Sequence, residues 1–224
     1  MNRVEFRKKI LAANDAEAAM LNEKFAATGT FVVDLVSSPG SGKTSLLEAT
    51  ALQLADSVRV GCVVGDIATE LDAQRLRNAG LPAHQIVTGG ACHLDARLVR
   101  EGLETAGFGE LDLLFIENVG NLVCPASYAL GDDVKVALLS VAEGHDKPFK
   151  YPAIFARADV SLITKIDLLP HVDFDIAVAR EQIRSLNPDA EILEISTRAG
   201  KGIDAWCRLL RTRSAAKAAV APAP

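Results

Sequence analysis

The sequence lacks the features that mark membrane, secreted or general nucleic-acid-binding proteins. No apolar run approaches the roughly 18 residues that a membrane-spanning helix requires. The N-terminal stretch MNRVEFRKKILAAND is amphipathic and has no apolar signal-peptide core. The net charge of −5 gives no basic excess for contact with phosphate backbones. These absences predict a cytoplasmic protein that contacts neither a membrane nor nucleic acid.

Cysteine is scarce and dispersed. The four cysteines lie far apart in the chain, and disulfides are rare in the cytoplasm, so each is either a buried apolar residue or a metal-binding or catalytic thiol. Cys62 lies inside the apolar run VRVGCVV, and Cys207 follows Trp206 on an expected helix, so we expect both in the core. Cys92 and Cys124 lie in polar, glycine-bearing surroundings and are considered below.

The chain also lacks internal repeats and any sign of a second full domain. A length of 224 residues with 49% hydrophobic residues suits one domain with a complete core. We expect an N-terminal helix over 1–28 that packs on the main domain, which spans 29–212. The low-complexity end AAKAAVAPAP predicts a disordered tail over 213–224.

Apolar runs and glycine-rich turns alternate with helical periodicity. FVVDLVS at 31–37 breaks into a Ser/Gly/Pro loop, and a helix follows from Lys43, which is the βα unit of a parallel sheet. Apolar strands buried on both faces predict an α/β fold of the P-loop NTPase type, with a mostly parallel central sheet and helices on both faces. Further strands are expected at 58–64, 111–116, 134–141, 160–164 and 191–195, and helices at 4–27, 70–79, 93–105, 175–187 and 203–212.

The loop SSPGSGKTS at 37–45 is close to the phosphate-binding pattern G-x-x-x-x-G-K-[ST], with Ser37 in the place of the first glycine. Gly40 and Gly42 allow the backbone N–H groups to surround a phosphate at the start of a helix. Lys43 would reach the β- and γ-phosphates, and the Thr44 hydroxyl would ligate Mg²⁺. The alternative is a plain Gly/Ser turn, which the strand before and the helix after disfavour. The expected nucleotide contacts are Ser38, Pro39, Gly40, Ser41, Gly42, Lys43, Thr44 and Ser45.

The stretch Thr164-Lys165-Ile166-Asp167 follows an apolar strand and resembles the guanine-reading pattern Asn-Lys-x-Asp, with Thr164 in place of the asparagine. Lys165 can stack its stem on the base, and Asp167 can accept from the guanine edge. Ser196 and Thr197, after the last strand, complete the expected base site. An ATP-using kinase is the alternative, but no arginine cluster for a lid over the phosphates is evident in the sequence.

Two acidic residues end apolar strands. Asp66 follows VGCVVG and Glu117 follows LDLLFI, and ligands of parallel sheets bind at the carboxyl ends of strands. We expect both carboxylates to face Mg²⁺ or the attacking water, with Lys43, Asp66, Glu117 and Gly120 as the catalytic set. Glu117-Asn118-Val119-Gly120 takes the place of a D-x-x-G switch, whose glycine amide would contact the γ-phosphate. A helix N-cap is the structural alternative for Asp66.

Cys92 and His93 are adjacent in TGGACHLDA, and Cys124 lies four residues beyond Gly120 in ENVGNLVCP. Thiolate and imidazole ligands suit Zn²⁺ or Ni²⁺, and three ligands leave the coordination shell incomplete. A site shared across a dimer interface would complete it. Because Cys124 follows the switch so closely, we expect loss of the γ-phosphate to move a metal ligand. The alternative is two half-buried thiols and an exposed histidine without a ligand.

Taken together, these motifs resemble the HypB family of hydrogenase nickel-incorporation GTPases, metal-delivery P-loop GTPases related to UreG. UreG-like proteins carry a Cys-Pro-His metal motif, whereas this chain has Cys-His and NVGNLVCP. The resemblance extends to about residue 212, and it is carried in order by LVSSPGSGKTSLL, GDIATELDAQRL, TGGACHLDA, IENVGNLVCPASYALGD, KYPAIFARADVSLITKIDLLP and ISTRAGKGIDAW.

The resemblance implies GTP hydrolysis coupled to nickel insertion into [NiFe]-hydrogenase, with Ni²⁺ or Zn²⁺ bound by Cys92, His93 and Cys124. It also implies a homodimer favoured by GTP, and as partners a HypA-type zinc metallochaperone and the hydrogenase large-subunit precursor. Residues 1–30 contain neither Cys nor His, so we expect no high-affinity nickel loading there. We expect slow turnover because no arginine finger is evident, with Arg75 and Arg97 as remaining candidates.

Three other functions are compatible with the same motifs. The chain could serve another nickel enzyme, such as urease or carbon monoxide dehydrogenase, because the client is recognised by surface features. It could be a metal-binding regulatory scaffold whose nucleotide site is structural. It could be an ATP-using P-loop enzyme, which competition between ATP and GTP would reveal.

Overall fold

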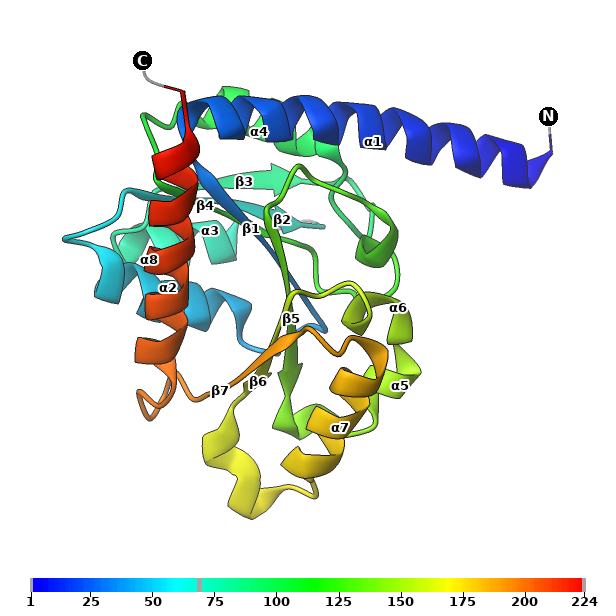
Figure 1. The fold of residues 1–224 in the computed structure, drawn as a ribbon, viewed down its shortest axis with the longest axis vertical. Helices are drawn as coiled ribbons and strands as arrows, with labels where there is room; N and C mark the ends of the chain where they lie inside the picture. The colour runs from blue at the N-terminus through cyan, green and yellow to red at the C-terminus, as the bar shows by residue number, and fades with distance from the viewer. Residues whose placement is uncertain (1, 68–69, 223–224) are drawn as a thin grey trace.

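The computed structural model describes residues 2–67 and 70–222, and within them seven strands form one sheet in the order β3-β2-β4-β1-β5-β6-β7 (Figure 1). Every pairing is parallel, so the expected α/β fold is confirmed. The central strand β1 lies between β4 and β5, and its carboxyl end leads into the glycine-rich loop. The strands are β1 Phe31–Ser37, β2 Val60–Asp66, β3 Ala83–Val87, β4 Leu113–Glu117, β5 Val134–Ser140, β6 Val160–Thr164 and β7 Glu191–Ile195.

Helices cover both faces of the sheet because alternate residues of each strand point to opposite sides. In β1, Val33 and Leu35 pack with α2, α3 and α8, whose fully buried Trp206 lies in the same cluster. Val32 faces the other side and packs with Phe25 of α1 and with α4. The helices are α1 Arg3–Thr28, α2 Lys43–Leu54, α3 Leu71–Asn78, α4 Ala96–Ala106, α5 Lys147–Lys150, α6 Pro152–Phe155, α7 Ile176–Leu186 and α8 Ile203–Val220, with 3₁₀ turns η1 Pro125–Ser127, η2 Val141–Glu143 and η3 Ile166–His171.

Two elements differ from the sequence-based expectation. Strand β3 was not predicted, because its five residues AHQIV include polar ones and form a short edge strand. Helix α4 begins at Ala96 and not at residue 93, since the Asp95 side chain accepts from the Leu98 N–H at 2.8 Å and caps the helix there. This later start leaves Cys92 and His93 in a loop. The two cysteines expected in the core, Cys62 and Cys207, are fully buried.

The two terminal helices are held to the rest of the domain by different contacts. The second half of α1 is held through Ala18, Leu21 and Phe25, while its first half extends beyond the rest of the chain (Figure 1). The expectation of a disordered tail over 213–224 is wrong for residues 213–220, which continue α8. Lys217 forms an ion pair of 2.5 Å with Asp133. Residues 223–224 lie outside the described part of the chain.

Within the described residues, no helix is both long enough and apolar enough to span a membrane.

Candidate functional site

A cavity of about 500 Å³ opens at the carboxyl ends of β1, β2 and β4. This is the edge of a parallel sheet at which ligands bind. Pro39, Gly40 and residues 42–45 form one wall, the segment 117–120 forms another, and Asp66 at the end of β2 also lines the cavity. The volume falls in the range of small-molecule and cofactor sites. The phosphate-binding loop and the switch segment predicted from the sequence are thus brought together here.

The phosphate-binding loop is shaped by two glycines in the left-handed region, Gly40 at φ 74° and Gly42 at φ 98°. Side chains with a Cβ rarely adopt this conformation. Helix α2 then starts at Lys43, so its N-terminal N–H groups face the cavity. The Lys43 ammonium donates to the Ser37 hydroxyl at 3.0 Å, and this hydroxyl donates to the Ser38 carbonyl at 2.7 Å.

Glu143, which belongs to none of the motifs recognised in the sequence, holds the same loop from the side of β5. It accepts from the Ser41 hydroxyl at 2.6 Å and from the Ser140 N–H at 3.2 Å. Its second oxygen lies 3.5 Å from the Lys147 ammonium. Its signal in the sequence is the pattern Ser140-x-x-Glu143, a capping box directly after a buried strand.

Three oxygen-bearing side chains meet beside Lys43. The Thr44 hydroxyl lies 3.1 Å from Asp72 Oδ1 and 3.0 Å from Glu117 Oε1. One hydroxyl proton can serve only one of these carboxylates, and the other Glu117 oxygen is buried without a hydrogen-bond partner. Two carboxylates around a threonine oxygen, one with an unused buried oxygen, fit a Mg²⁺ ion. Asp72 was missed because it lies inside α3 and does not end a strand.

The electrostatics of this group reflect burial. Burial raises the pKa of Glu117 to about 7, against the opposing attraction of Lys43. Burial likewise lowers the pKa of Lys43, while the charge of Glu117 works in the opposite direction. A bound dication would favour the ionised form of Glu117 and so lower its pKa again. The site is therefore suited to a positively charged ligand.

The expected base-reading residues lie on the other side of the phosphate loop. The Thr164 hydroxyl donates to the Ser41 carbonyl at 2.8 Å, so threonine in place of asparagine still ties β6 to the loop. Lys165, the only non-glycine residue with positive φ in the described chain, donates to the Gly40 carbonyl at 2.6 Å. Asp167 accepts from the Ser196 hydroxyl at 2.6 Å. Thr197 lines a small adjoining cavity with Lys165.

The switch segment touches the phosphate loop at Gly120. A Cβ at this position would lie 3.0 Å from Pro39 Cγ and 3.1 Å from the Pro39 backbone N, so any larger residue would displace the loop. Of the two arginines considered above, Arg75 lines the cavity and its guanidinium lies 2.8 Å from Glu48. Arg97 pairs with Glu101 on α4 and is not among the residues lining the cavity as described.

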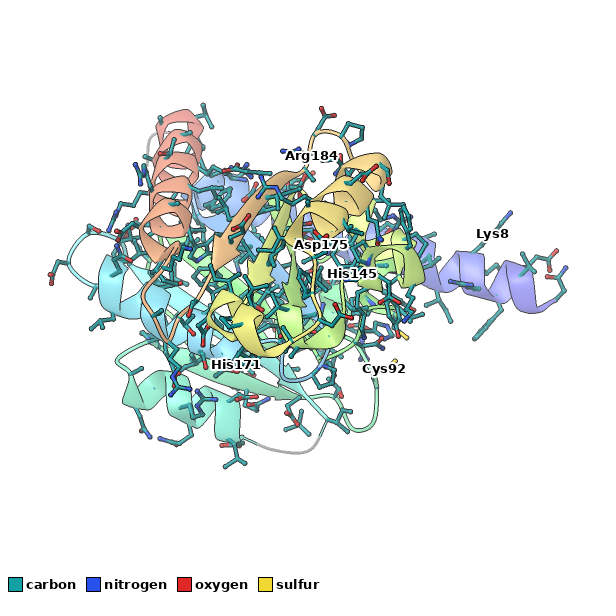
Figure 2. All side chains as sticks on the ribbon, turned by 90° about the horizontal axis from the view of Figure 1, so that it is seen from below. Lys8, Cys92, His145, His171, Asp175 and Arg184 are labelled. Carbon is teal, nitrogen blue, oxygen red and sulfur yellow. The ribbon has the colours of Figure 1, made fainter. Side chains whose placement is uncertain are left out.

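Cys92, His93 and Cys124 form a compact cluster, with their candidate ligand atoms all within 4.8 Å of one another. The two Sγ atoms lie 2.9 Å apart, and Cys92 Sγ lies 3.8 Å from His93 Nδ1. The His93 ring packs against Tyr128 with ring centroids 4.1 Å apart. Figure 2 shows Cys92 at the edge of the molecule, on the side toward which the helix bearing Lys8 extends. The three residues expected to converge therefore do so.

The protonation of the cluster follows from its surroundings. Partial burial lowers the pKa of His93, although the charge of Asp95 acts in the opposite direction. The lowered pKa favours the neutral imidazole, which is the form that binds metals. The hydrogen bond with Cys124, and then burial, raise the pKa of Cys92. Binding of a metal ion by both sulfurs would displace the proton of each thiol.

The chain is similar to known proteins over most of its length. The family model described as CobW/HypB/UreG, nucleotide-binding domain, matches residues 31–194. The hydrogenase maturation factor HypB of Azotobacter vinelandii is 50% identical over 206 residues, which cover 92% of this chain and 67% of that protein. The hydrogenase/urease maturation factor HypB of Helicobacter pylori strain 26695 is 42% identical over 207 residues, covering 90% and 84%.

The fold agrees as well. The crystal structure of HypB from Helicobacter pylori in complex with nickel superposes with a TM-score of 0.86 at 40% identity and covers 91% of this chain and 96% of that one. A family model that spans most of the chain, together with relatives similar over nine-tenths of it, leaves one assignment. The chain belongs to the CobW/HypB/UreG family of P-loop nucleotide-binding proteins and, within it, to the HypB branch.

Proposed function

We propose that this protein is a GTPase that delivers nickel during maturation of [NiFe]-hydrogenase, binding the metal and the nucleotide at two linked sites. The proposal is supported by one observation above all. A single segment of eight residues, 117–124, starts at the carboxylate beside Thr44, touches the phosphate loop at Gly120 and ends at the Cys124 thiol of the metal cluster. Nucleotide state and metal binding thus depend on the same stretch of backbone.

GTP would bind with its phosphates in the loop of residues 38–45 and its base between Lys165 and Asp167. Lys43 would leave Ser37 and donate to the phosphates, and the Gly120 N–H would face the γ-phosphate. Thr44, Asp72 and Glu117 would hold Mg²⁺, with Asp66 at the rim of the cavity beside them. When bound, the ion neutralises charge on the β- and γ-phosphates. Glu117 and Asp66 would then orient the attacking water.

The metal carried would be Ni²⁺ or Zn²⁺, bound by Cys92, His93 and Cys124. Two thiolates and one imidazole suit both ions, and a tetrahedral ion would still lack one ligand. A homodimer favoured by GTP would supply it. The three-ligand set is suited to a cargo that must leave again, since an incomplete shell holds a metal less firmly than a closed one.

The partners follow from the family. We propose a HypA-type zinc metallochaperone as donor or co-loader of the metal, the hydrogenase large-subunit precursor as client, and the cytoplasm as the compartment. A second client is favoured by a specific observation: a relative that is 42% identical is a hydrogenase/urease maturation factor. Urease is therefore the alternative client of the same reaction.

The test measures nickel affinity in two nucleotide states. Purified full-length protein is titrated with Ni²⁺ in the presence of GDP and of a non-hydrolysable GTP analogue, and phosphate release from GTP is followed separately. We expect slow GTP hydrolysis and affinities that differ about fivefold or more, the range of ordinary coupling free energies. Lys43→Ala should abolish both hydrolysis and the difference. Equal nickel affinities in both states would contradict the coupling.

A further inference from the structure

Two asparagines flank Gly120, and both are bonded to the loop that carries the metal cluster. Asn118 is almost fully buried, and its side-chain oxygen accepts from the Leu94 N–H at 3.1 Å and from the Val119 N–H at 3.0 Å. Leu94 follows His93 directly. The side-chain oxygen of Asn118, in the switch segment, is therefore the acceptor for a buried backbone N–H in the loop that carries Cys92 and His93.

Asn121 makes the second link, on the other side of Gly120. Its side-chain amide donates to the Cys92 carbonyl at 3.1 Å, and its oxygen accepts from the Val123 N–H at 2.8 Å. The main-chain groups on either side of His93, the Cys92 carbonyl and the Leu94 N–H, are thus held by side chains on either side of Gly120. Neither side chain is itself a candidate metal ligand.

The orientation of the Asn118 side chain is fixed by Asp34 of β1. Its amide nitrogen lies 3.2 Å from Asp34 Oδ1, and Asp34 is a fully buried carboxylate paired with Lys135. The nitrogen therefore faces a carboxylate while the oxygen faces two N–H groups. An aspartate at this position would bring a second buried carboxylate against Asp34, so the residue type is set by its neighbours.

A movement of the switch segment would carry residues 92–94 with it. Gly120 packs closely against Pro39, since an added Cβ would lie only 3.0–3.1 Å from Pro39 atoms, so a phosphate that shifts the loop or the Gly120 amide would also shift residues 118–121. If Asn118 moved alone, the Leu94 N–H would lose its acceptor in a buried place, which is unfavourable by an amount comparable with a whole hydrogen bond. The lower-energy response is for residues 92–94 to follow.

We propose that Asn118 and Asn121 are positioning residues that transmit the nucleotide state to the metal cluster through the backbone of residues 92–94. This inference rests on the proposed function, since it names how the two sites of that function communicate. It adds a second path to the direct one through Cys124. Cys124 lies on the same backbone segment as the switch and would move with it. The Cys92-His93 pair would move because the side chains of Asn118 and Asn121 are hydrogen-bonded to its backbone.

The test uses the metal-free full-length protein, so it does not depend on nickel chemistry. Amide hydrogen exchange is measured over residues 91–96 with GDP and with a non-hydrolysable GTP analogue. In the wild type we expect exchange of this segment to differ about fivefold or more between the two states. In Asn121→Ala, a partly exposed site, the difference should fall below about twofold, and Asn118→Ser provides a second variant.

Asn187→Ala is the matched control. Its side-chain amide also donates to a carbonyl of another segment, that of Ala158 at 3.0 Å, but it lies outside the residues that line the nucleotide cavity and the metal cluster. This variant should keep the wild-type difference. Unchanged state dependence in both asparagine variants would overturn the inference, as would a wild-type segment 91–96 that does not respond to nucleotide.

A second measurement separates transmission from a merely structural effect. The ratio of Ni²⁺ affinities in the two nucleotide states is determined for each variant, because loss of stability alone would change both affinities and leave their ratio. We expect the ratio to approach one in Asn121→Ala. If the wild type keeps its ratio and the variants do too, only the inference fails. If the wild-type ratio is one, the coupling in the proposed function fails, and the exchange measurement still decides whether the asparagines transmit nucleotide state.

Discussion

The ammonium of Lys43 donates a hydrogen bond to the hydroxyl of Ser37 across 3.0 Å. Ser37 occupies the position at which the general phosphate-loop pattern has glycine, and it is fully buried. Burial lowers the pKa of Lys43 because the charged form is poorly solvated there. The serine therefore supplies an acceptor for this ammonium in the nucleotide-free protein, a task that glycine cannot perform.

Ser37→Ala should therefore destabilise the nucleotide-free protein while leaving GTP affinity equal or higher. The variant leaves a buried ammonium without this acceptor, which is unfavourable by about 1–3 kcal/mol. In the complex, Lys43 would donate to phosphate instead. Urea unfolding and GTP titration measure the two effects, with the exposed Ser57→Ala as control. Weaker GTP binding at unchanged stability would show that Ser37 acts on the nucleotide.

Glu117 predicts a specific pH dependence of stability. Burial raises its pKa from the usual 4.5 to about 7, so the folded protein holds a proton that the unfolded chain releases between these values. Stability contributed by this group is therefore lost as pH rises from about 4.5 to 7 and stays low above that. Glu117→Gln removes this dependence.

The stability difference between Glu117→Gln and the wild type should shift in favour of the variant by roughly 3 kcal/mol between pH 4.5 and pH 8, as expected for a shift of about two and a half pKa units. Urea unfolding of the Mg²⁺-free and nucleotide-free proteins measures it. Adding Mg²⁺ should stabilise the wild type at pH 8 and have less effect on the variant. A difference independent of pH would contradict the raised pKa.

The sequence alone predicted those parts of the site whose residues are consecutive or closely spaced in the chain. The loop 37–45, the stretch 164–167 and the pair Cys92-His93 were recognised because their chemistry depends on short spacings. Asp72 and Glu143 were not, because they reach Thr44 and Ser41 from the first turn of α3 and from a 3₁₀ turn. Their contribution depends on how distant elements pack, which periodicity does not reveal.

The predicted tail failed for a related reason. Alanine-rich sequence can be disordered alone, yet alanine has the highest helix propensity and α8 has a surface to pack on. The edge strand β3 was overlooked because a short strand at a sheet edge is defined by its neighbour β2 more than by its own residues. In both cases tertiary contact decided a segment whose own signal was weak.

Asp167→Asn should change the base that is bound. Asp167 would accept from the guanine ring N–H and the exocyclic amine, while an asparagine can donate to the carbonyl of xanthine at the same place. We expect GTP affinity to fall about tenfold or more and affinity for xanthosine triphosphate to rise, since bonds to a charged acceptor contribute about 1.5–3 kcal/mol each. Competition against a labelled GTP analogue measures both. An unchanged preference for GTP would remove Asp167 from the base site.

His93→Ala should lower the affinity for Ni²⁺ about tenfold or more and leave nucleotide binding with GDP unchanged, because it removes one of three ligands outside the cavity. His171→Ala is the matched control, since that histidine is exposed at the end of η3. Affinity is measured at pH 8 with a competing chelator. Equal affinities in the wild type and both variants would remove the histidine from the metal site.

The end of α8 should contribute to the stability of the whole domain. The Ser214 hydroxyl donates to the Asp112 carbonyl at 2.9 Å, and Lys217 pairs with Asp133, whose other oxygen accepts from the Val32 N–H at the start of β1. Both members of the pair are mostly shielded from solvent, with 15% and 16% of their side-chain surface exposed. The end of α8 therefore holds the start of the central strand β1 in place through Asp133.

Ending the chain after Arg213 should lower the free energy of unfolding by about 1–3 kcal/mol, and Lys217→Ala alone should account for part of this. Arg208→Ala is the control, because Arg208 is exposed on the same helix. Thermal and urea unfolding measure the change, and GTP binding should survive because these contacts lie at the opposite end of β1 from the phosphate loop. A shortened protein as stable as the full chain would show that the removed residues 214–224 add nothing to the stability of the domain, which is the result that a disordered tail predicts.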